Sequence, residues 1–297
     1  MALLVRRIDA PFGAEILGAD LHAPPRSEFI DMVNEAVAAH AVVVLRGQFI
    51  TDEEQVRFSR AFGPLELPPT LGVQGAQSRR VARELYDVSN LDEKGNFLPR
   101  ESLRLASNRA NEEFHTDSSF NDLPTKWSLL SARILPPEGA DTEFVDTRMV
   151  HDALPPDLRE RARNAVAEHW FWKTRGRAGF GTVTEEMRRA MPPVAHPLVR
   201  IIPESRRAAL YIGNHATHVL GWPIAEGEAF LRQLNDFAAQ PRFIYSHRWC
   251  DGDFVIWDNR CTIHRATPYD VFKYKRDLRR TTINEYGSEM ASTDARG

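Results

Sequence analysis

The sequence has few cysteines, no long apolar run and little net charge. Its 297 residues include only two cysteines, Cys250 and Cys261, which cannot form a disulfide framework, and neither belongs to a C-x-x-C metal pattern. No apolar run approaches the roughly 18 residues that a membrane-spanning helix needs, and the first residues lack the apolar region of a secretory signal. A net charge of -3 gives no basic stripe for nucleic acid. We therefore expect a cytoplasmic protein that binds neither nucleic acid nor a membrane.

Internal repeats and low-complexity linkers are also missing, so we expect one domain over residues 1–297. Ser27 is a candidate N-cap of a first helix, and Thr51 and Glu54 form a capping box at the start of a second. The predicted helices cover residues 27–40, 51–64, roughly 147–168, and 226–240.

Most of the remaining chain consists of short segments rich in aromatic and β-branched residues and separated by Gly, Pro and Asp. The predicted strands cover residues 41–47, 126–134, 141–147, 208–213, 242–249, 253–259 and 279–284. This pattern is typical of a sandwich or jelly roll with helices on its outside. Residues 67–83 and 173–190 show no clear periodicity, and loops of that length are often functional lids.

Candidate metal ligands lie in two short stretches. "NEEFHTDSSF" (111–120) contains His115 and Asp117, whose side chains would share one face if the stretch is a strand. In "VIWDNRCTIHRATPYD" (255–270) a strand turns and is followed by His264. A single histidine is more often structural than a ligand. Two histidines and one carboxylate, however, fill one face of an octahedral ion and leave three positions open, as in non-haem Fe(II) oxygenases.

A basic stretch, "YKRDLRRTTIN", follows with Arg276 and Arg280 before or at the start of a strand. A dicarboxylate that chelates iron through one end needs a cation at its other end, and arginine can bond a carboxylate through two parallel N–H groups. Taken alone, this stretch reads as a solvated strand end. Combined with the two candidate metal stretches, it favours an oxygenase site.

These motifs resemble those of the TauD/TfdA family of Fe(II)- and 2-oxoglutarate-dependent dioxygenases, and within it the 2,4-dichlorophenoxyacetate (aryloxyalkanoate) dioxygenases. The likeness runs through "VVVLRGQ", "FGPLE", "FHTDSSF", "GADTEFVDTR", "IGNHATHV", "WDNRCTIHR" and "RDLRRTT". It implies a mainly β fold with flanking helices around a double-stranded β-helix (jelly-roll) core. It also implies Fe(II), 2-oxoglutarate and O2 as cofactor and co-substrates.

The resemblance further implies roles for individual residues at the metal. His115, Asp117 and His264 match the iron ligands, which are also the catalytic residues of the family. Thr142 and Arg276 match the pair that holds the distal carboxylate of 2-oxoglutarate, although Thr142 also fits a plain β-branched strand position. Because Asp117 is a carboxylate rather than the small residue of the related halogenases, we expect hydroxylation.

Four further residues match positions at the family's substrate. Arg280 matches the arginine that reaches the substrate's acidic group, and Ser118 matches a residue whose backbone N–H adds to that contact. His215 and His218 match histidines near the site, where a hydrogen-bonded strand-end histidine is an equal alternative.

One departure from the phenoxyacetate enzymes concerns the substrate. Their substrate-binding lysine has no counterpart in residues 67–77, which contain no lysine. Arg79, Arg80 or Lys173 could supply a second positive charge. The aromatic segment 169–180 could line a pocket for a ring, or equally be strand core followed by a surface loop.

We therefore expect hydroxylation of a small organic acid, most simply an aryloxyalkanoate with oxidative ether cleavage, coupled to conversion of 2-oxoglutarate into succinate and CO2. The same chemistry on a taurine-like sulfonate or on a natural-product amino or carboxylic acid is the first alternative. A zinc metallohydrolase using the same three ligands and a catalytically silent binding module are alternatives of other classes. A homo-oligomer also stays open, since relatives commonly self-associate.

Overall fold

The computed structural model describes residues 2–68, 80–177 and 182–285. Its largest element is a seven-stranded sheet in the order β1-β2-β3-β13-β5-β15-β4, in which every pair is antiparallel except β2–β3. The strands are β1 (Leu4–Arg7), β2 (Ala14–Leu17), β3 (Val42–Leu45), β13 (Phe254–Asp258), β5 (Thr125–Ile134), β15 (Asp277–Asn284) and β4 (Tyr86–Ser89). A second sheet has the order β12-β6-β14, with β12 (Ile244–His247), β6 (Thr142–Asp146) and β14 (Thr262–Ala266).

The two sheets pack face to face. Successive side chains of a strand point to opposite faces of its sheet, so a strand of the large sheet can contribute to two apolar clusters. In β3, Val42 and Val44 belong to the apolar cluster that also contains Phe144 of β6. Val43 and Leu45 point the other way and pack in the cluster under the helices. This arrangement confirms the predicted jelly-roll core.

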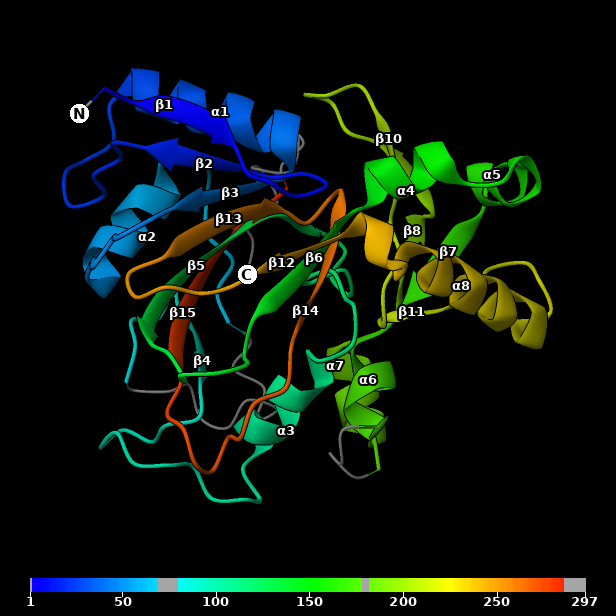
Figure 1. Ribbon diagram of the computed structural model, residues 1–297. Coiled ribbons are helices and arrows are strands. Elements are labelled where there is room, and N and C mark those ends of the chain that lie inside the picture. Colours follow the sequence, from blue (N-terminus) through cyan, green and yellow to red (C-terminus); the bar gives the residue numbers. More distant parts are fainter. Residues whose placement is uncertain (1, 69–79, 178–181, 286–297) are drawn as a thin grey trace, which may run out of the picture.

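Helices α1 (Ser27–His40) and α2 (Asp52–Arg60) cover the outer face of the large sheet, as Figure 1 shows at its upper left. The capping box of Thr51 and Glu54 is confirmed, since each residue's side chain accepts a hydrogen bond from the other's backbone N–H. The prediction for Ser27 is wrong. Ser27 is already the first helical residue, and the extended Arg26 before it takes the cap position without a side-chain bond.

A third group of elements packs on the other face of the small sheet, at the right of Figure 1. It contains the sheet β11-β7-β8, with β7 (Val166–His169), β8 (Val194–Pro197) and β11 (Ala216–Val219), and the hairpin β9 (Val199–Ile201) with β10 (Ala208–Leu210). Its helices are α4 (Thr147–Ala153), α5 (Pro156–Arg163) and α8 (Ile224–Ala238). Val145 and Ile263 of the small sheet join its apolar cluster.

Two predictions of secondary structure need correction. The helical region 147–168 is interrupted after α4, where Pro155 and Pro156 end one helix and begin the next, and its last residues form β7. The aperiodic stretch 173–190 contains most of α6 (Phe171–Arg177) and all of α7 (Glu185–Ala190). Two further elements, α3 (Leu103–Ala110) and the 3-10 turn Pro241–Phe243, were not predicted, and neither were eight strands of three to five residues.

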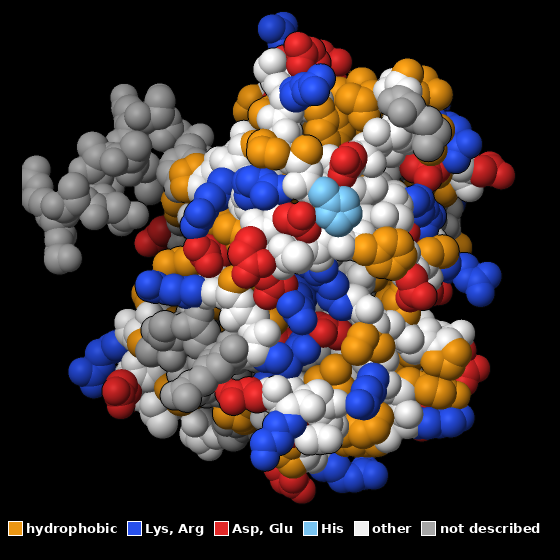
Figure 2. Space-filling view, turned by 90° about the vertical axis from the view of Figure 1, so that its left-hand side faces the viewer, with side chains coloured by type: hydrophobic (Ala, Val, Ile, Leu, Met, Phe, Trp, Pro, Cys, Tyr) orange, Lys and Arg blue, Asp and Glu red, His pale blue; other side chains and the backbone are white. Residues whose placement is uncertain are grey.

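Charge is distributed without a dominant sign. Figure 2 shows one face on which Lys and Arg side chains are interspersed with Asp and Glu. Many of the described charged residues form ion pairs, such as Arg80 with Asp277 and Arg279 with Asp52. Among the described residues, no helix is long and apolar enough to cross a membrane.

Candidate active site

His115 and His264 come together through an isolated antiparallel bridge between the segment before Asp117 and strand β14. The His115 N–H donates to the His264 carbonyl at 2.9 Å, and the His264 N–H donates to the His115 carbonyl at 2.8 Å. Together with Asp117 they offer ligand atoms that all lie within 4.8 Å of one another, and all three residues are buried. Within the described ranges this is the single cluster of its kind.

Residues 111–120 do not form the regular strand that would place His115 and Asp117 on one face. Only His115 pairs, and residues 117–120 form a turn in which Ser118 has a φ of 50°. This segment lies close to the backbone at Gly213. A side chain would not fit there easily, because a Cβ at this glycine would lie 3.1 Å from the His115 Cα. The turn, rather than the period of a strand, brings the Asp117 carboxylate beside both imidazoles.

Both histidines bring Nε2 close to the Asp117 carboxylate, and His115 is suited to bind a metal through this atom. The Nδ1 of His115 lies 2.9 Å from the Glu113 carbonyl, to which only an N–H can donate, so Nε2 keeps its lone pair. The Nε2 atoms lie 3.9 Å (His115) and 3.6 Å (His264) from Asp117 carboxylate oxygens. Burial, reinforced by His115, lowers the pKa of His264, so this ring is neutral.

Asp117 is fixed as an anion. Its carboxylate accepts a hydrogen bond of 2.7 Å from the Ser128 hydroxyl on β5 and forms an ion pair with Arg280 on β15. Burial alone raises the pKa of this carboxyl, but Arg280, with His264 and His115, lowers it well below its ordinary value. Asn259 supports the arrangement, because its side-chain amide donates to Ser128 Oγ at 2.9 Å and its oxygen accepts from the Asp117 N–H at 3.3 Å.

Arg276 and Thr142 line the same small cavity as His115 and His264. Arg276 is 5% exposed, and its guanidinium makes no hydrogen bond or ion pair with a described residue. Its nearest aromatic partner is Tyr269, whose ring centroid is 5.9 Å away, and burial lowers its pKa. A buried cation without an anion is costly, so this position fits an acidic ligand. The Thr142 hydroxyl accepts from Trp249 Nε1 at 3.1 Å.

A second cavity adjoins the first across His115 and Arg280. It is lined by Asp117 and Ser118 at the metal ligands, and by Phe120 and His215, whose rings lie 4.9 Å apart. The Arg280 guanidinium lies 4.5 Å from the centroid of the Tyr86 ring.

Glu66 connects three hydroxyl groups behind this cavity. Its buried carboxylate accepts hydrogen bonds from Tyr86 at 2.6 Å, Ser118 at 2.8 Å and Thr125 at 3.0 Å. Since Ser118 follows a candidate metal ligand and Tyr86 underlies Arg280, Glu66 orients both. Sequence reasoning missed this role, and its only signal was the position of Glu66 in "FGPLE".

The remaining sequence candidates lie elsewhere. His218 does not line either cavity; its Nδ1 lies 2.9 Å from the Thr217 hydroxyl and 3.7 Å from Glu168. Arg80 is bound by Asp87 and Asp277. Arg79 lies outside the described residues.

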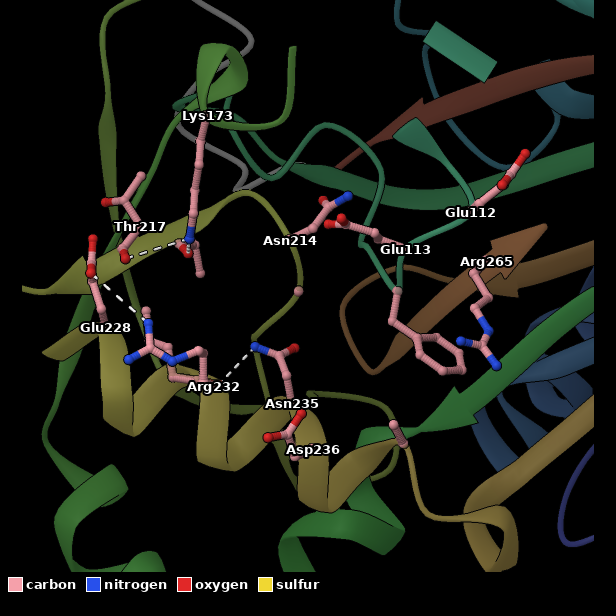
Figure 3. Close-up of a pocket in the computed structure, with 15 residues that line it drawn as sticks. Glu112, Glu113, Lys173, Asn214, Thr217, Glu228, Arg232, Asn235, Asp236 and Arg265 are labelled. Atoms are coloured by element: carbon pink, nitrogen blue, oxygen red, sulfur yellow. Dashed lines mark hydrogen bonds and ion pairs between the residues drawn. The ribbon is translucent and has the colours of Figure 1, made fainter. Parts of the chain in front are cut away.

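Lys173 lines a different cavity, of about 350 Å³, between α8 and the loop before His115. Figure 3 shows its side chain extending into this space toward the backbone at Thr217, and its ammonium donates to the carbonyls of Ala216 and Thr217. The expectation that Lys173 supplies a charge to the substrate cavity is therefore wrong.

The sequence is similar to that of known proteins over nearly its whole length. The profile of the family described as "Taurine catabolism dioxygenase TauD, TfdA family" matches residues 4–282. The alpha-ketoglutarate-dependent 2,4-dichlorophenoxyacetate dioxygenase of Cupriavidus pinatubonensis is 40% identical over 282 residues, 95% of this chain and 98% of that protein. The (S)-phenoxypropionate/alpha-ketoglutarate-dioxygenase of Sphingobium herbicidovorans is 34% identical over 278 residues, 89% of each chain.

A solved structure gives the same result. The crystal structure of AAD-2 in complex with Mn(II) and N-oxalylglycine superposes with a TM-score of 0.88 at 37% identity and covers 96% of this chain and 98% of that one. With matches over nearly its whole length, the chain belongs to the TauD/TfdA family of dioxygenases.

Proposed function

We propose that this protein is a non-haem Fe(II)- and 2-oxoglutarate-dependent dioxygenase that hydroxylates a small organic acid of the aryloxyalkanoate class. The relatives named for 2,4-dichlorophenoxyacetate and (S)-phenoxypropionate, at 40% and 34% identity, support the substrate class. The observation that carries the reaction type is the buried, unpaired Arg276 in the cavity of the metal ligands.

In this proposal His115, Asp117 and His264 hold the iron. Two neutral imidazoles and one carboxylate are the donor set of a facial triad, and they leave positions open for other ligands. When bound, the iron with 2-oxoglutarate and O2 supplies the oxidising power, with succinate and CO2 as co-products. The protein's own contribution is to hold the three side chains, through Glu113, Ser128 and the backbone bridge, in the orientation described above.

Arg276 and Thr142 hold the distal carboxylate of 2-oxoglutarate. N-oxalylglycine, bound in the related AAD-2 structure, has the same two carboxylates and oxo group with an NH replacing one CH2, which supports this co-substrate. A guanidinium buried without an anion gains its partner when the dicarboxylate enters. A zinc hydrolase would use the same three ligands but would leave Arg276 without a partner.

The substrate occupies the adjoining cavity. Its acidic group lies against Arg280 and the Ser118 N–H, which donates to none of the described residues. Its ring packs on Phe120, with His215 at the side. If the hydroxylated carbon bears an ether oxygen, the resulting hemiacetal collapses to a phenol and a glyoxylate-type product. We also propose a cytoplasmic location, which fits two unpaired cysteines.

Anaerobic addition of Fe(II) and 2-oxoglutarate tests the proposal. A visible charge-transfer band is expected from the wild type and is lost in His115→Ala. With O2, succinate release should be stimulated by phenoxyacetates or phenoxypropionates in an acid panel. A protein that shows neither the band nor succinate is not a 2-oxoglutarate dioxygenase, and one stimulated only by sulfonates has a different substrate class.

A further inference from the structure

The substrate cavity contains a second arginine besides Arg280. Arg104 projects from α3 and lines the cavity that also contains Asp117, Phe120 and Arg280. No sequence pattern singled it out, and the three cations that the sequence did suggest lie in other contacts or outside the described residues. Arg104 is therefore the described residue that can supply the missing second charge.

Only one nitrogen of the Arg104 guanidinium is used within the described protein. Nη1 donates to Asp87 Oδ2 at 2.5 Å and to the Leu91 carbonyl at 3.0 Å, with Ser89 Oγ at 3.4 Å. Nη2 and Nε donate to no described residue, and neither is a buried atom. These two nitrogens form the planar edge that arginine uses to bind an oxyanion through two hydrogen bonds.

The Asp87 carboxylate is shared between two arginines, because it forms ion pairs with both Arg104 and Arg80. Arg80 Nη2 lies 2.9 Å from Asp87 Oδ1 and Nε lies 3.2 Å from Oδ2, while Arg80 also bonds Asp277 at 2.7 and 2.8 Å.

The ion pairs continue away from the cavity. Among the described residues these ion pairs join four arginines (Arg80, Arg104, Arg133, Arg279) and three aspartates (Asp52, Asp87, Asp277). Asp87 and Arg104 are the members of this network that line the substrate cavity, and of the two Arg104 is the hydrogen-bond donor.

We propose that Arg104 forms a second oxyanion subsite in the substrate cavity, so that preferred substrates carry a second anionic group, such as a carboxylate, besides the acid held at Arg280. This inference rests on the proposed function, and it concerns the part of the substrate that points away from the metal ligands. Arg280 binds the acid group next to the carbon that is hydroxylated. Arg104 binds the second anionic group, at the other end of the substrate.

The test compares matched substrates in the wild-type holoenzyme and in variants. Phenoxyacetates with a carboxylate at ring position 2, 3 or 4 are compared with the corresponding carboxamides and with unsubstituted phenoxyacetate, by succinate release. For at least one position, the wild type should show kcat/KM about tenfold or more higher for the carboxylate than for the carboxamide. This preference should vanish in Arg104→Gln and fall in Arg104→Lys, which keeps the charge but not the fork.

Arg104 also links α3 to β4, so a general disturbance of the cavity in the variants has to be distinguished from loss of the subsite. Such a disturbance lowers kcat/KM for the carboxylate and the carboxamide alike and leaves their ratio unchanged, which would overturn the proposal. Arg100→Gln is the matched control, since Arg100 lies over the Phe272 ring outside the cavity, and its ratio should equal that of the wild type. A wild type that turns over phenoxyacetate without preferring any carboxylate refutes the subsite alone, whereas no succinate with any acid refutes the proposed function.

Discussion

Arg280 forms an ion pair with Asp117, the carboxylate that stands between the imidazoles of His115 and His264. The two residues are 163 positions apart in the sequence, and neither side chain is more than 12% exposed. The proposed metal ligand and the proposed cation for the substrate are thus coupled electrostatically.

Asp117→Ala should remove metal binding and also destabilise the metal-free protein. Without its carboxylate, Arg280 becomes a cation that is only 12% exposed and lacks a partner, and the free energy of unfolding should fall by up to about 3 kcal/mol. Chemical denaturation of the apoprotein measures the loss, and calorimetric titration with Mn(II) measures binding. The double variant Asp117→Ala/Arg280→Met should regain much of the stability; if it is no more stable than Asp117→Ala, the ion pair does not explain the loss.

Arg276→Met should have the opposite effect on the apoprotein. The guanidinium is buried and no described residue supplies it with an anion, so replacing it with an apolar side chain should leave the melting temperature equal or higher. The same variant should lose the thermal stabilisation that 2-oxoglutarate gives to the wild type, and the KM for 2-oxoglutarate should rise about a hundredfold or more. Thermal unfolding with and without 2-oxoglutarate measures both the melting temperature of the apoprotein and the stabilisation by the co-substrate. A melting temperature that falls sharply without ligand would mean that Arg276 is a structural cation.

Glu66→Ala should affect the acid substrate and spare the co-substrate. The variant releases Tyr86 and Ser118, which orient Arg280 and the substrate-facing turn, so the KM for the acid should rise about tenfold while the KM for 2-oxoglutarate stays the same. Glu66→Gln keeps an acceptor and should be milder, and the exposed Glu101→Ala is the control. Equal increases in both KM values would indicate a general loss of structure.

His169 should make the protein sensitive to acid. Burial, together with the nearby His196, lowers the pKa of His169 from 6.5 to about 3. Between these two values the unfolded chain binds a proton that the folded chain does not, so stability is complete above pH 6.5 and is lost as the pH falls, by up to about 1.4 kcal/mol per pH unit.

Denaturation curves between pH 7 and 4 measure this slope. In His169→Phe the slope of unfolding free energy against pH should correspond to up to one proton fewer taken up on unfolding, because phenylalanine cannot titrate. The control His22→Gln changes an exposed histidine and should keep the wild-type slope. A wild-type slope in His169→Phe would assign the acid sensitivity to another group.

The parts of the fold that follow from local chemistry could be predicted. Val42 to Leu45 are apolar on both faces and form a central strand, and Thr51 with Glu54 begins α2, because period and capping are properties of neighbouring residues. Most of the shortest strands could not be predicted. The three residues of β9 carry too little pattern and are defined by the partner strand that they pair with, whereas the equally short β10 lies within the predicted strand 208–213.

The candidate site divides in the same way. The residue types at His115, Asp117 and His264 predicted a metal cluster, and the structure brings these side chains together. The turn at Ser118 and the contacts of Glu66 could not be predicted, since they depend on residues that approach only in the folded chain.

Under the proposed function, strand β15 sets the distance between the co-substrate and the acid substrate. Arg276, just before the strand, and Arg280, within it, line one cavity, while Arg279 on the opposite face pairs with Asp52. Four residues of extended chain span about 13 Å at about 3.3 Å per residue, which sets how far apart two carboxylates can be anchored. Inserting a single residue between the two arginines would turn one of them to the outer face, so the spacing between co-substrate and substrate can change only in steps of two residues.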